Sequence, residues 1–289
     1  MSPNPLPDAV ESKSLDIQHD TDPEHDHGLA RRIPHLGHAL LFFSLSWMVV
    51  SVSAMAIFSL THLRQDSIAQ HPGLLLLAQA LAYLIILAIS YSLFPHLWVV
   101  SFLQGIHWGS LAARRKWRWI VAGGVLLSAA AQSCLYLLPQ PKTTPFDQLL
   151  SKPSSGWFLL AFAVLLAPIT EEIAFRGFLL PALATAYDWL SLERSPAALD
   201  RWERSTQHST SALVFAAIFS SVPFVLLHAD QLSHAWGILA VLYGVSLALS
   251  FVRIRTHSVA CSTLLHATYN LTIFAVTLFS TGGFRHFSR

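Results

Sequence analysis

The sequence predicts an all-α protein, a polytopic transmembrane helical bundle of about seven spans (range about six to eight), from its composition and the length of its apolar runs. Hydrophobic residues make up 53% of the 289 residues and charged residues 12%, and the mean hydropathy is +0.50. A soluble chain carries about 25% charged residues, so the composition disfavours a soluble enzyme. The apolar runs lack the period-two alternation of barrel strands, which favours helices.

Net charge and cysteine content exclude other classes of protein. The net charge of +2 arises from scattered Lys and Arg, so we expect no nucleic-acid partner. Cys134 and Cys261 both lie in apolar runs, which argues against a disulfide scaffold or a zinc-finger site. The expected surroundings are therefore a lipid bilayer, and the oligomeric state stays open.

Residues 1–35 differ in composition from the rest of the chain. They hold seven of the sixteen acidic residues and five prolines, and few apolar residues, so we expect a disordered tail on the cytoplasmic side. His19, His25 and His27 lie among these acids and could hold a metal ion, but a solvated tail without fixed geometry is the favoured interpretation.

Seven apolar runs follow the tail, and each has the length of a membrane-spanning helix, about 17 to 25 residues. The runs cover residues 38–60, 73–94 (extending to 105 if the helix continues past Pro95), 119–138, 157–180, 211–229, 235–252 and 258–279.

The distribution of Lys and Arg predicts the orientation, because these side chains are retained on the cytoplasmic side. With the N-terminus inside, seven spans place five of them outside, namely Arg64, Lys142, Lys152, Arg285 and Arg289. Eleven fall inside: Arg31, Arg32, Arg114, Arg115, Lys116, Arg118, Arg194, Arg201, Arg204, Arg253 and Arg255. We therefore expect an integral, multi-pass membrane protein with a cytoplasmic N-terminus.

Two adjacent carboxylates stand in the fourth run, where an ionisable group costs about 2.5 to 3.5 kcal/mol and suggests a function. Glu172 and Arg176 are spaced i, i+4 and can neutralise each other on one helix face. Glu171 points about 100° away, which leaves it available as a base. Pro168 lacks an N–H and frees the carbonyl of Val164, so we expect a widened turn. A purely structural Glu172–Arg176 pair is the alternative.

Two further polar pairs lie in later runs. Phe224 and His228 share a helix face, so the phenyl ring can pack against the imidazole, although a histidine at a helix end is more often interfacial. His266 and Asn270 lie one turn apart and can direct two donors at one oxygen, act as an incomplete metal site, or join helices as polar contacts. A carboxylate, two histidines and an asparagine on three helices are the parts needed to activate water and stabilise an oxyanion.

The ordered set Glu-Glu-x-x-x-Arg at 171–176, Phe-x-x-x-His at 224–228 and His-x-x-x-Asn at 266–270 resembles the three motifs of the CPBP family. That family comprises type II CAAX prenyl endopeptidases and bacterial CAAX-protease and bacteriocin-processing (abortive-infection) proteins. The resemblance covers roughly 155–280 and implies a division into N-terminal transmembrane helices (36–150), a protease core (151–282) and a short C-terminal tail (283–289).

The resemblance implies an intramembrane endopeptidase that opens toward the cytoplasm and cleaves a membrane-protein or lipidated-peptide substrate. Glu171 would be the general base, His228 would hold and polarise the water, and His266 with Asn270 would form the oxyanion hole. Glu172 and Arg176, with Phe224, would support these groups.

Metal use and two other functions stay open. Glu171, His228 and His266 suit Zn²⁺, but HExxH is absent and we favour a metal-free base. The same buried groups could serve a transporter's proton relay or an inactive membrane scaffold, such as a bacteriocin-immunity protein, although the absence of a repeat argues against transport. The predicted span ends also place His228 near the face opposite to Glu171 and His266, so a broken helix is needed to unite them.

Overall fold

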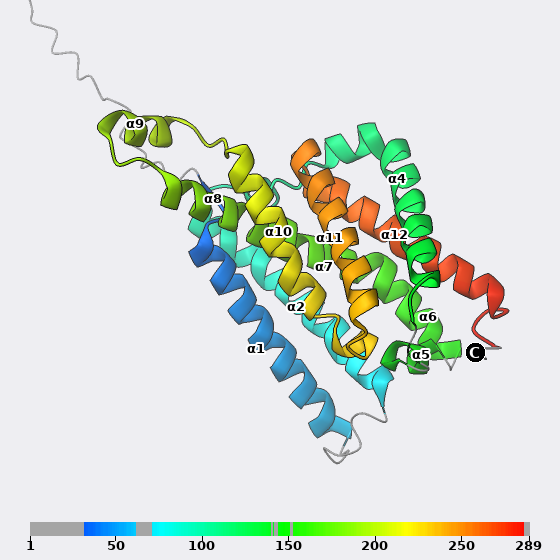
Figure 1. The fold of residues 1–289 in the computed structure, drawn as a ribbon. Coiled ribbons are helices and arrows are strands. Elements are labelled where there is room, and N and C mark those ends of the chain that lie inside the picture. Colours follow the sequence, from blue (N-terminus) through cyan, green and yellow to red (C-terminus); the bar gives the residue numbers. More distant parts are fainter. Residues whose placement is uncertain (1–31, 62–70, 140, 142–143, 151–152, 286–289) are drawn as a thin grey trace, which may run out of the picture.

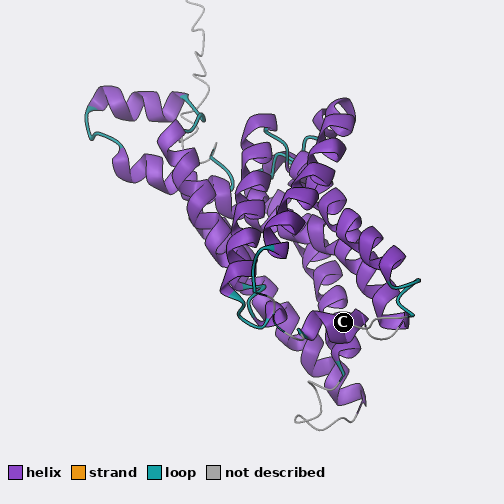
Figure 2. Ribbon diagram, turned by 45° about the vertical axis from the view of Figure 1, so that its right-hand side comes forward, coloured by secondary structure: helices purple, strands orange, loops and turns teal. Residues whose placement is uncertain are grey.

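The computed structural model describes residues 32–61, 71–139, 141, 144–150 and 153–285. These residues form helices joined by loops, with no strand among them (Figures 1 and 2). Six helical segments are long and apolar enough to cross a membrane, and a shorter apolar helix joins them. The predicted all-α bundle of about seven spans is thereby confirmed, whereas the acidic tail with His19, His25 and His27 lies outside the described residues.

The bounds of the helices differ from the predicted runs mainly at charged or proline-containing ends. The first spans are α1 (Leu36–Thr61), α2 (Pro72–Trp98) and α4 (Ser110–Tyr136), with a short α3 (Phe102–Gly105) between the last two. Helix α2 continues through Pro95 and ends at Trp98, because Val99 has a positive φ of 58°. Helix α4 begins nine residues before the predicted run, since its first turns carry the basic residues 114–118.

The fourth span is a single long helical run that changes type along its length. After α5 (Pro145–Leu150), it comprises α6 (Pro153–Ala161), the π-helical η2 (Phe162–Leu166), α7 (Ala167–Glu172), the π-helical η3 (Ile173–Leu179) and α8 (Leu180–Ser191). The predicted end at residue 180 is therefore wrong, and the helix continues to Ser191.

The remaining helices complete the bundle. They are α9 (Pro196–Arg204), α10 (Thr210–Leu226), the 3₁₀ turn η4 (Asp230–Leu232), α11 (Trp236–Thr256) and α12 (Val259–Ser280). Serine side chains cap three of them: Ser195 accepts from the Ala198 amide, Ser209 from the Ala212 amide and Ser258 from the Cys261 amide.

The long helices alternate in direction, so the bundle has two ends (Figure 1). We call the N-terminal face the end at which α1, α4, α10 and α12 begin and α2, α8 and α11 finish, and we call the other end the opposite face. At the N-terminal face the His38 ring lies 5.6 Å from the Trp98 ring, and the Val259 amide donates to the His107 carbonyl at 3.0 Å. At the opposite face the rings of Trp157 and Phe284 lie 5.6 Å apart.

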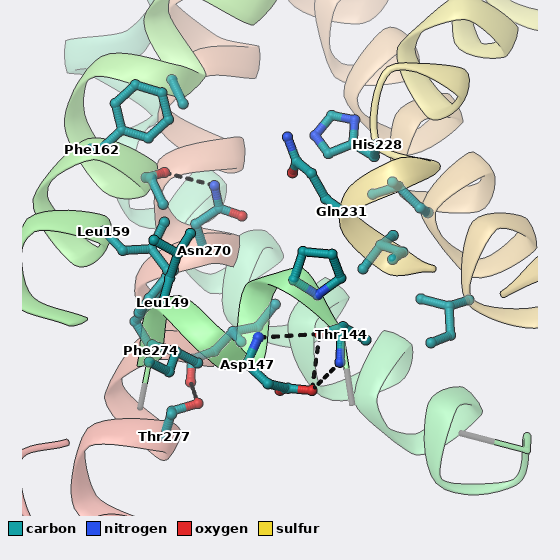
Figure 3. A pocket seen from close by; sticks show the side chains of 18 of the residues that line it. Thr144, Asp147, Leu149, Leu159, Phe162, His228, Gln231, Asn270, Phe274 and Thr277 are labelled. Carbon is teal, nitrogen blue, oxygen red and sulfur yellow. Dashed lines mark hydrogen bonds between the residues drawn. The ribbon is translucent and has the colours of Figure 1, made fainter. Parts of the chain in front are cut away.

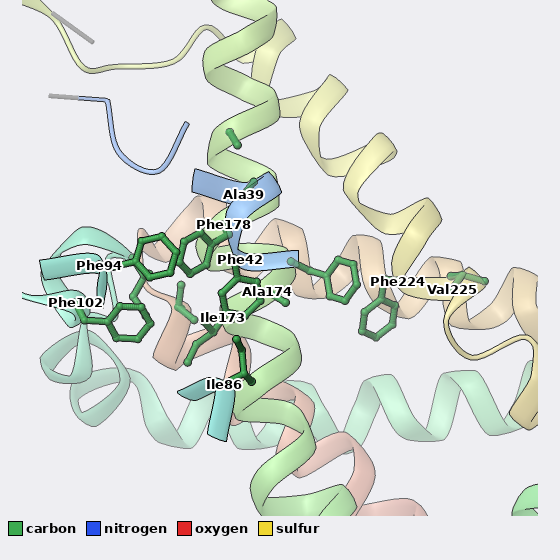
Figure 4. Packing of buried hydrophobic residues seen from close by; sticks show 14 of the residues in the cluster. Ala39, Phe42, Ile86, Phe94, Phe102, Ile173, Ala174, Phe178, Phe224 and Val225 are labelled. Atoms are coloured by element: carbon green, nitrogen blue, oxygen red, sulfur yellow. The ribbon is translucent and has the colours of Figure 1, made fainter. Parts of the chain in front are cut away.

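An aromatic cluster of Phe42, Phe94, Trp98, Phe102 and Phe178 fills the bundle next to the N-terminal face (Figure 4). Phe178 is fully buried and stacks on Phe42 with ring centroids 4.5 Å apart, and it lies 4.7 Å from Phe94. Each such pair contributes about 0.5 to 1.5 kcal/mol beyond the burial of its surface. The cluster therefore joins α1, α2, α3 and η3 in one packed layer.

Candidate active site

The fully buried carboxylate of Glu172 accepts from two helices. Arg176 lies one turn later, and its Nη1 is 3.0 Å from Glu172 Oε1, as the i, i+4 spacing predicts. His266 Nδ1 on α12 is 3.1 Å from the same oxygen. The guanidinium also donates through Nη2 to the carbonyl and hydroxyl oxygens of Ser246 on α11, both at 2.7 Å. These bonds tie the fourth span to α11 and α12 and compensate a buried charge that would otherwise be costly.

Glu171, the preceding residue, faces a cavity. Its side chain is 14% exposed, and its Oε2 lies 3.8 Å from His266 Nε2, a distance that is too long for a direct hydrogen bond. The two ring nitrogens of His266 thus face the two neighbouring carboxylates: Nδ1 faces Glu172, and Nε2 faces Glu171. The ionised Glu172 is an acceptor only, so the Nδ1 atom carries the proton in this contact.

His228 lies just beyond the end of α10, and its ring is held in place by its own helix. Nδ1 is 2.8 Å from the carbonyl oxygen of Phe224, which directs the other ring nitrogen, Nε2, away from that carbonyl. The ring packs against Phe224 with centroids 4.9 Å apart, the contact that the i, i+4 spacing predicts. The Phe224 ring centroid also lies 6.0 Å from the His266 ring centroid and 4.8 Å from the Arg176 guanidinium carbon, so this ring packs beside both histidines and the buried ion pair.

The predicted conflict between the depths of these residues disappears in the structure. The fourth span does not end at 180, and Figure 1 shows it crossing the bundle obliquely from α6 to α8. Glu171 is therefore about 20 residues, or about 30 Å along the helix, from the end at Ser191. His228 is about 27 Å along α10 from Thr210 by the same measure. A short α10 and an inclined fourth span bring the motifs together without breaking α10.

Asn270 contacts the π-helical turn that precedes the two carboxylates. The turn η2 pairs amides with carbonyls five residues earlier, and the Ala167 amide donates to the Phe162 carbonyl. In this pattern Pro168 would be the partner of the Ala163 carbonyl, but proline has no N–H. Asn270 Nδ2 supplies the missing donor at 2.7 Å. The predicted widened turn is present, and the bonded carbonyl is that of Ala163 instead of Val164.

All four predicted catalytic residues, Glu171, His228, His266 and Asn270, line one cavity of about 1370 Å³. In Figure 3, His228 and Gln231 lie on one side of the cavity, and Asn270 and Phe162 lie on the other. Sequence reasoning did not identify Gln231, which follows His228 by three residues in η4. Its position after a proline-containing helix gave no signal of an inward-facing amide.

A metal ion needs several ligands at one point. Within the described residues no group of three His, Cys, Asp or Glu side chains is placed to hold one. Glu171 Oε2 and His266 Nε2 lie 3.8 Å apart, but His228 is not placed to join them, so Glu171, His228 and His266 do not form a three-ligand set among the described residues.

A comparison with protein families finds a match over part of the chain. No curated protein and no solved structure matches the chain. The family model described as type II CAAX prenyl endopeptidase Rce1-like matches residues 153–272, a range that contains all three motifs. With the six apolar spanning helices, this match identifies an integral, multi-pass membrane protein related to CAAX-type endopeptidases. Residues 153–272 of the chain are thus similar to the type II CAAX prenyl endopeptidase Rce1-like family.

Proposed function

We propose that the protein is an intramembrane endopeptidase that hydrolyses a peptide bond of a membrane-associated substrate, of CAAX type or otherwise, with water activated by Glu171. One observation carries the proposal. Arg176 and His266 Nδ1 both contact Glu172, which leaves the Glu171 carboxylate directed into the cavity beside His266 Nε2. A carboxylate without a neutralising partner in a cavity with mainly apolar walls is suited to act as a base.

Glu171 removes a proton from water as the water oxygen attacks the carbonyl carbon of the scissile bond. The new C–O bond converts the carbonyl oxygen to an oxyanion, and the C–N bond then breaks while Glu171 returns the proton to the leaving nitrogen. His228, with Nδ1 bound to the Phe224 carbonyl, offers Nε2 to hold and polarise the water.

The oxyanion needs donors at the place where its charge develops. Asn270 Nδ2 carries two hydrogens, and one is donated to Ala163, so the second remains to be offered to the cavity. His266, whose ring is oriented through its Nδ1 contact with Glu172, is the second donor of the proposed oxyanion hole. Glu172 and Arg176 thus support the reacting groups without contacting the substrate.

Cleavage of a quenched peptide by detergent-purified protein tests the proposal. Glu171→Gln keeps the shape of the side chain and removes the base, so we expect a loss of at least about 100-fold in kcat/KM. Glu193→Gln is the matched control, because Glu193 is exposed in the loop after α8 and should retain full activity. Full activity in Glu171→Gln would overturn the assignment and favour the scaffold or transporter functions.

A further inference from the structure

Two arginines at the N-terminal face are buried, whereas the other described Lys and Arg residues at this end are exposed. Arg32, which precedes α1, is 5% exposed, and Arg253, in the last turn of α11, is 7% exposed. Water solvates the exposed basic side chains, so they need no ligand. A guanidinium that is withdrawn from water keeps its charge, so it needs acceptors in the protein or in a bound group.

Arg32 is held in one orientation, but its guanidinium is only partly satisfied. Nη2 donates to the carbonyl oxygens of Trp202, at 3.1 Å, and of Ser205, and the guanidinium carbon lies 3.6 Å from the centroid of the Trp202 ring. Nε and Nη1 are enclosed and have no acceptor among the described residues. Buried donors are rarely left without an acceptor, so this fixed side chain has two nitrogens available for a ligand.

Arg253 has no full counter-charge beside it. Its Nε is enclosed and has no acceptor within the described part of the chain. The Cys261 thiol and the His107 ring lie near it, and burial followed by the charge of Arg253 lowers the pKa of His107, which favours the neutral ring. The end of α11 supplies only the partial negative charge of a helix C-terminus.

His208 lies near both arginines, where α8 ends and α10 begins (Figure 1). Its Nδ1 is 2.9 Å from Asp188, which also accepts from the Ser209 hydroxyl at 2.6 Å. Burial lowers the pKa of His208 despite this contact, and Arg32 and Arg253 lower it further, an effect that requires both cations to lie near the ring. Asp188 compensates one of the two arginine charges, so one positive charge is left over.

We propose that Arg32 and Arg253 form a binding site for a phosphate group at the N-terminal face. The two side chains offer three enclosed nitrogens without acceptors, and the surplus positive charge favours an anion. Phosphate matches guanidinium geometry and carries oxygens in several directions, so one group can accept from two arginines that come from different segments. The phosphate belongs either to a lipid headgroup or to a soluble compound. The site is separate from the proposed endopeptidase function and does not depend on it.

Thermal unfolding of the detergent-purified full-length protein tests the site, because a ligand that binds only the folded state raises the Tm with its concentration. Inorganic phosphate and dioctanoyl phosphatidic acid are titrated separately at constant ionic strength. Dioctanoylglycerol, which has the same acyl chains and no phosphate, is the lipid control. At least one phosphate probe should raise the Tm, and dioctanoylglycerol should not.

Variants locate the binding. Arg32→Gln and Arg253→Gln each remove one guanidinium and should weaken the binding of the phosphate probe at least about tenfold, since charge-assisted hydrogen bonds are lost. Arg255→Gln is the matched control, because Arg255 is exposed two residues after Arg253 and should bind as the wild type does. If Arg253→Gln does not fold, Arg32→Gln decides the outcome.

The two probes distinguish the sources of the phosphate. Stabilisation by phosphatidic acid alone assigns a lipid headgroup, and stabilisation by inorganic phosphate assigns a soluble compound. Failure of both probes to raise the Tm, or an effect of dioctanoylglycerol equal to that of phosphatidic acid, would overturn the proposal. An equal loss of binding in Arg255→Gln and Arg253→Gln would also overturn it, because it would show attraction to the whole basic surface instead of a site.

Discussion

Replacing Glu172 with alanine separates the structural carboxylate from the reactive one. The change removes the partner of a guanidinium that is 1% exposed and the acceptor of His266 Nδ1, while the two bonds from Arg176 to Ser246 remain. An unpaired buried charge costs about 3 to 5 kcal/mol when its partner is removed. Glu171→Gln changes a side chain that is 14% exposed and 3.8 Å from His266 Nε2, so folding should be nearly unaffected.

The assay is thermal unfolding of detergent-purified variants, followed by size-exclusion chromatography of the folded fraction. Glu172→Ala should lower both the Tm and the folded yield, and Glu172→Gln, which keeps an oxygen acceptor, should lose less. The double variant Glu172→Ala, Arg176→Met removes both members of the pair and should recover part of the loss. Equal losses in Glu172→Ala and Glu171→Gln would refute the division between a structural and a reactive carboxylate.

Three further predictions concern the oxyanion donor, metal use and pH. Asn270→Ala should lower kcat by about 10² to 10³ and leave measurable turnover, and an unchanged kcat would remove Asn270 from the reaction. Because the site should work without a metal, o-phenanthroline should leave peptide cleavage unchanged; inhibition that added Zn²⁺ reverses would contradict this. Burial lowers the pKa of His208 below its ordinary value of 6.5, with Arg32 and Arg253 adding to the effect, despite its contact with Asp188. The neutral ring is therefore favoured in the fold, so its contribution to stability is present above about pH 6.5 and is lost as the pH falls through the folded pKa. The Tm of the protein should fall between pH 7.5 and 5.5 by more than the Tm of His208→Gln, and parallel curves would show that His208 has no part.

Local geometry could be predicted from the sequence wherever helix periodicity alone decides the contact. The Glu172–Arg176 ion pair and the Phe224–His228 ring contact each follow from an i, i+4 spacing. The number of spans follows from the length and composition of the apolar runs, because each helix must satisfy its own backbone within the bilayer.

Contacts between helices could not be predicted, because sequence spacing does not determine them. The bond from His266 to Glu172 joins α12 to the fourth span, and no local pattern marks Glu172 as its partner. The predicted run ends at 180, yet in the structure the helix continues to Ser191, and Pro181 occupies the first turn of α8, where a missing N–H is tolerated. The widened turn at Pro168 was predicted. Which carbonyl loses its partner, that of Ala163 instead of Val164, depends on a π-helical turn that periodicity does not predict.

The adjacency of Glu171 and Glu172 itself explains how one bundle can hold a reactive carboxylate. A rotation of about 100° between consecutive residues separates their surroundings, so one carboxylate enters the core and the other enters the cavity. Arg176 and His266 Nδ1 both contact Glu172, the carboxylate in the core. Among the described residues, the ion-pair contact of Glu171, the carboxylate in the cavity, is the longer one of 3.8 Å to His266 Nε2. A single glutamate on this helix could not both neutralise Arg176 and remain free to accept a proton. Two neighbouring glutamates divide these tasks, and the imidazole between them keeps both carboxylates at fixed distances from one ring.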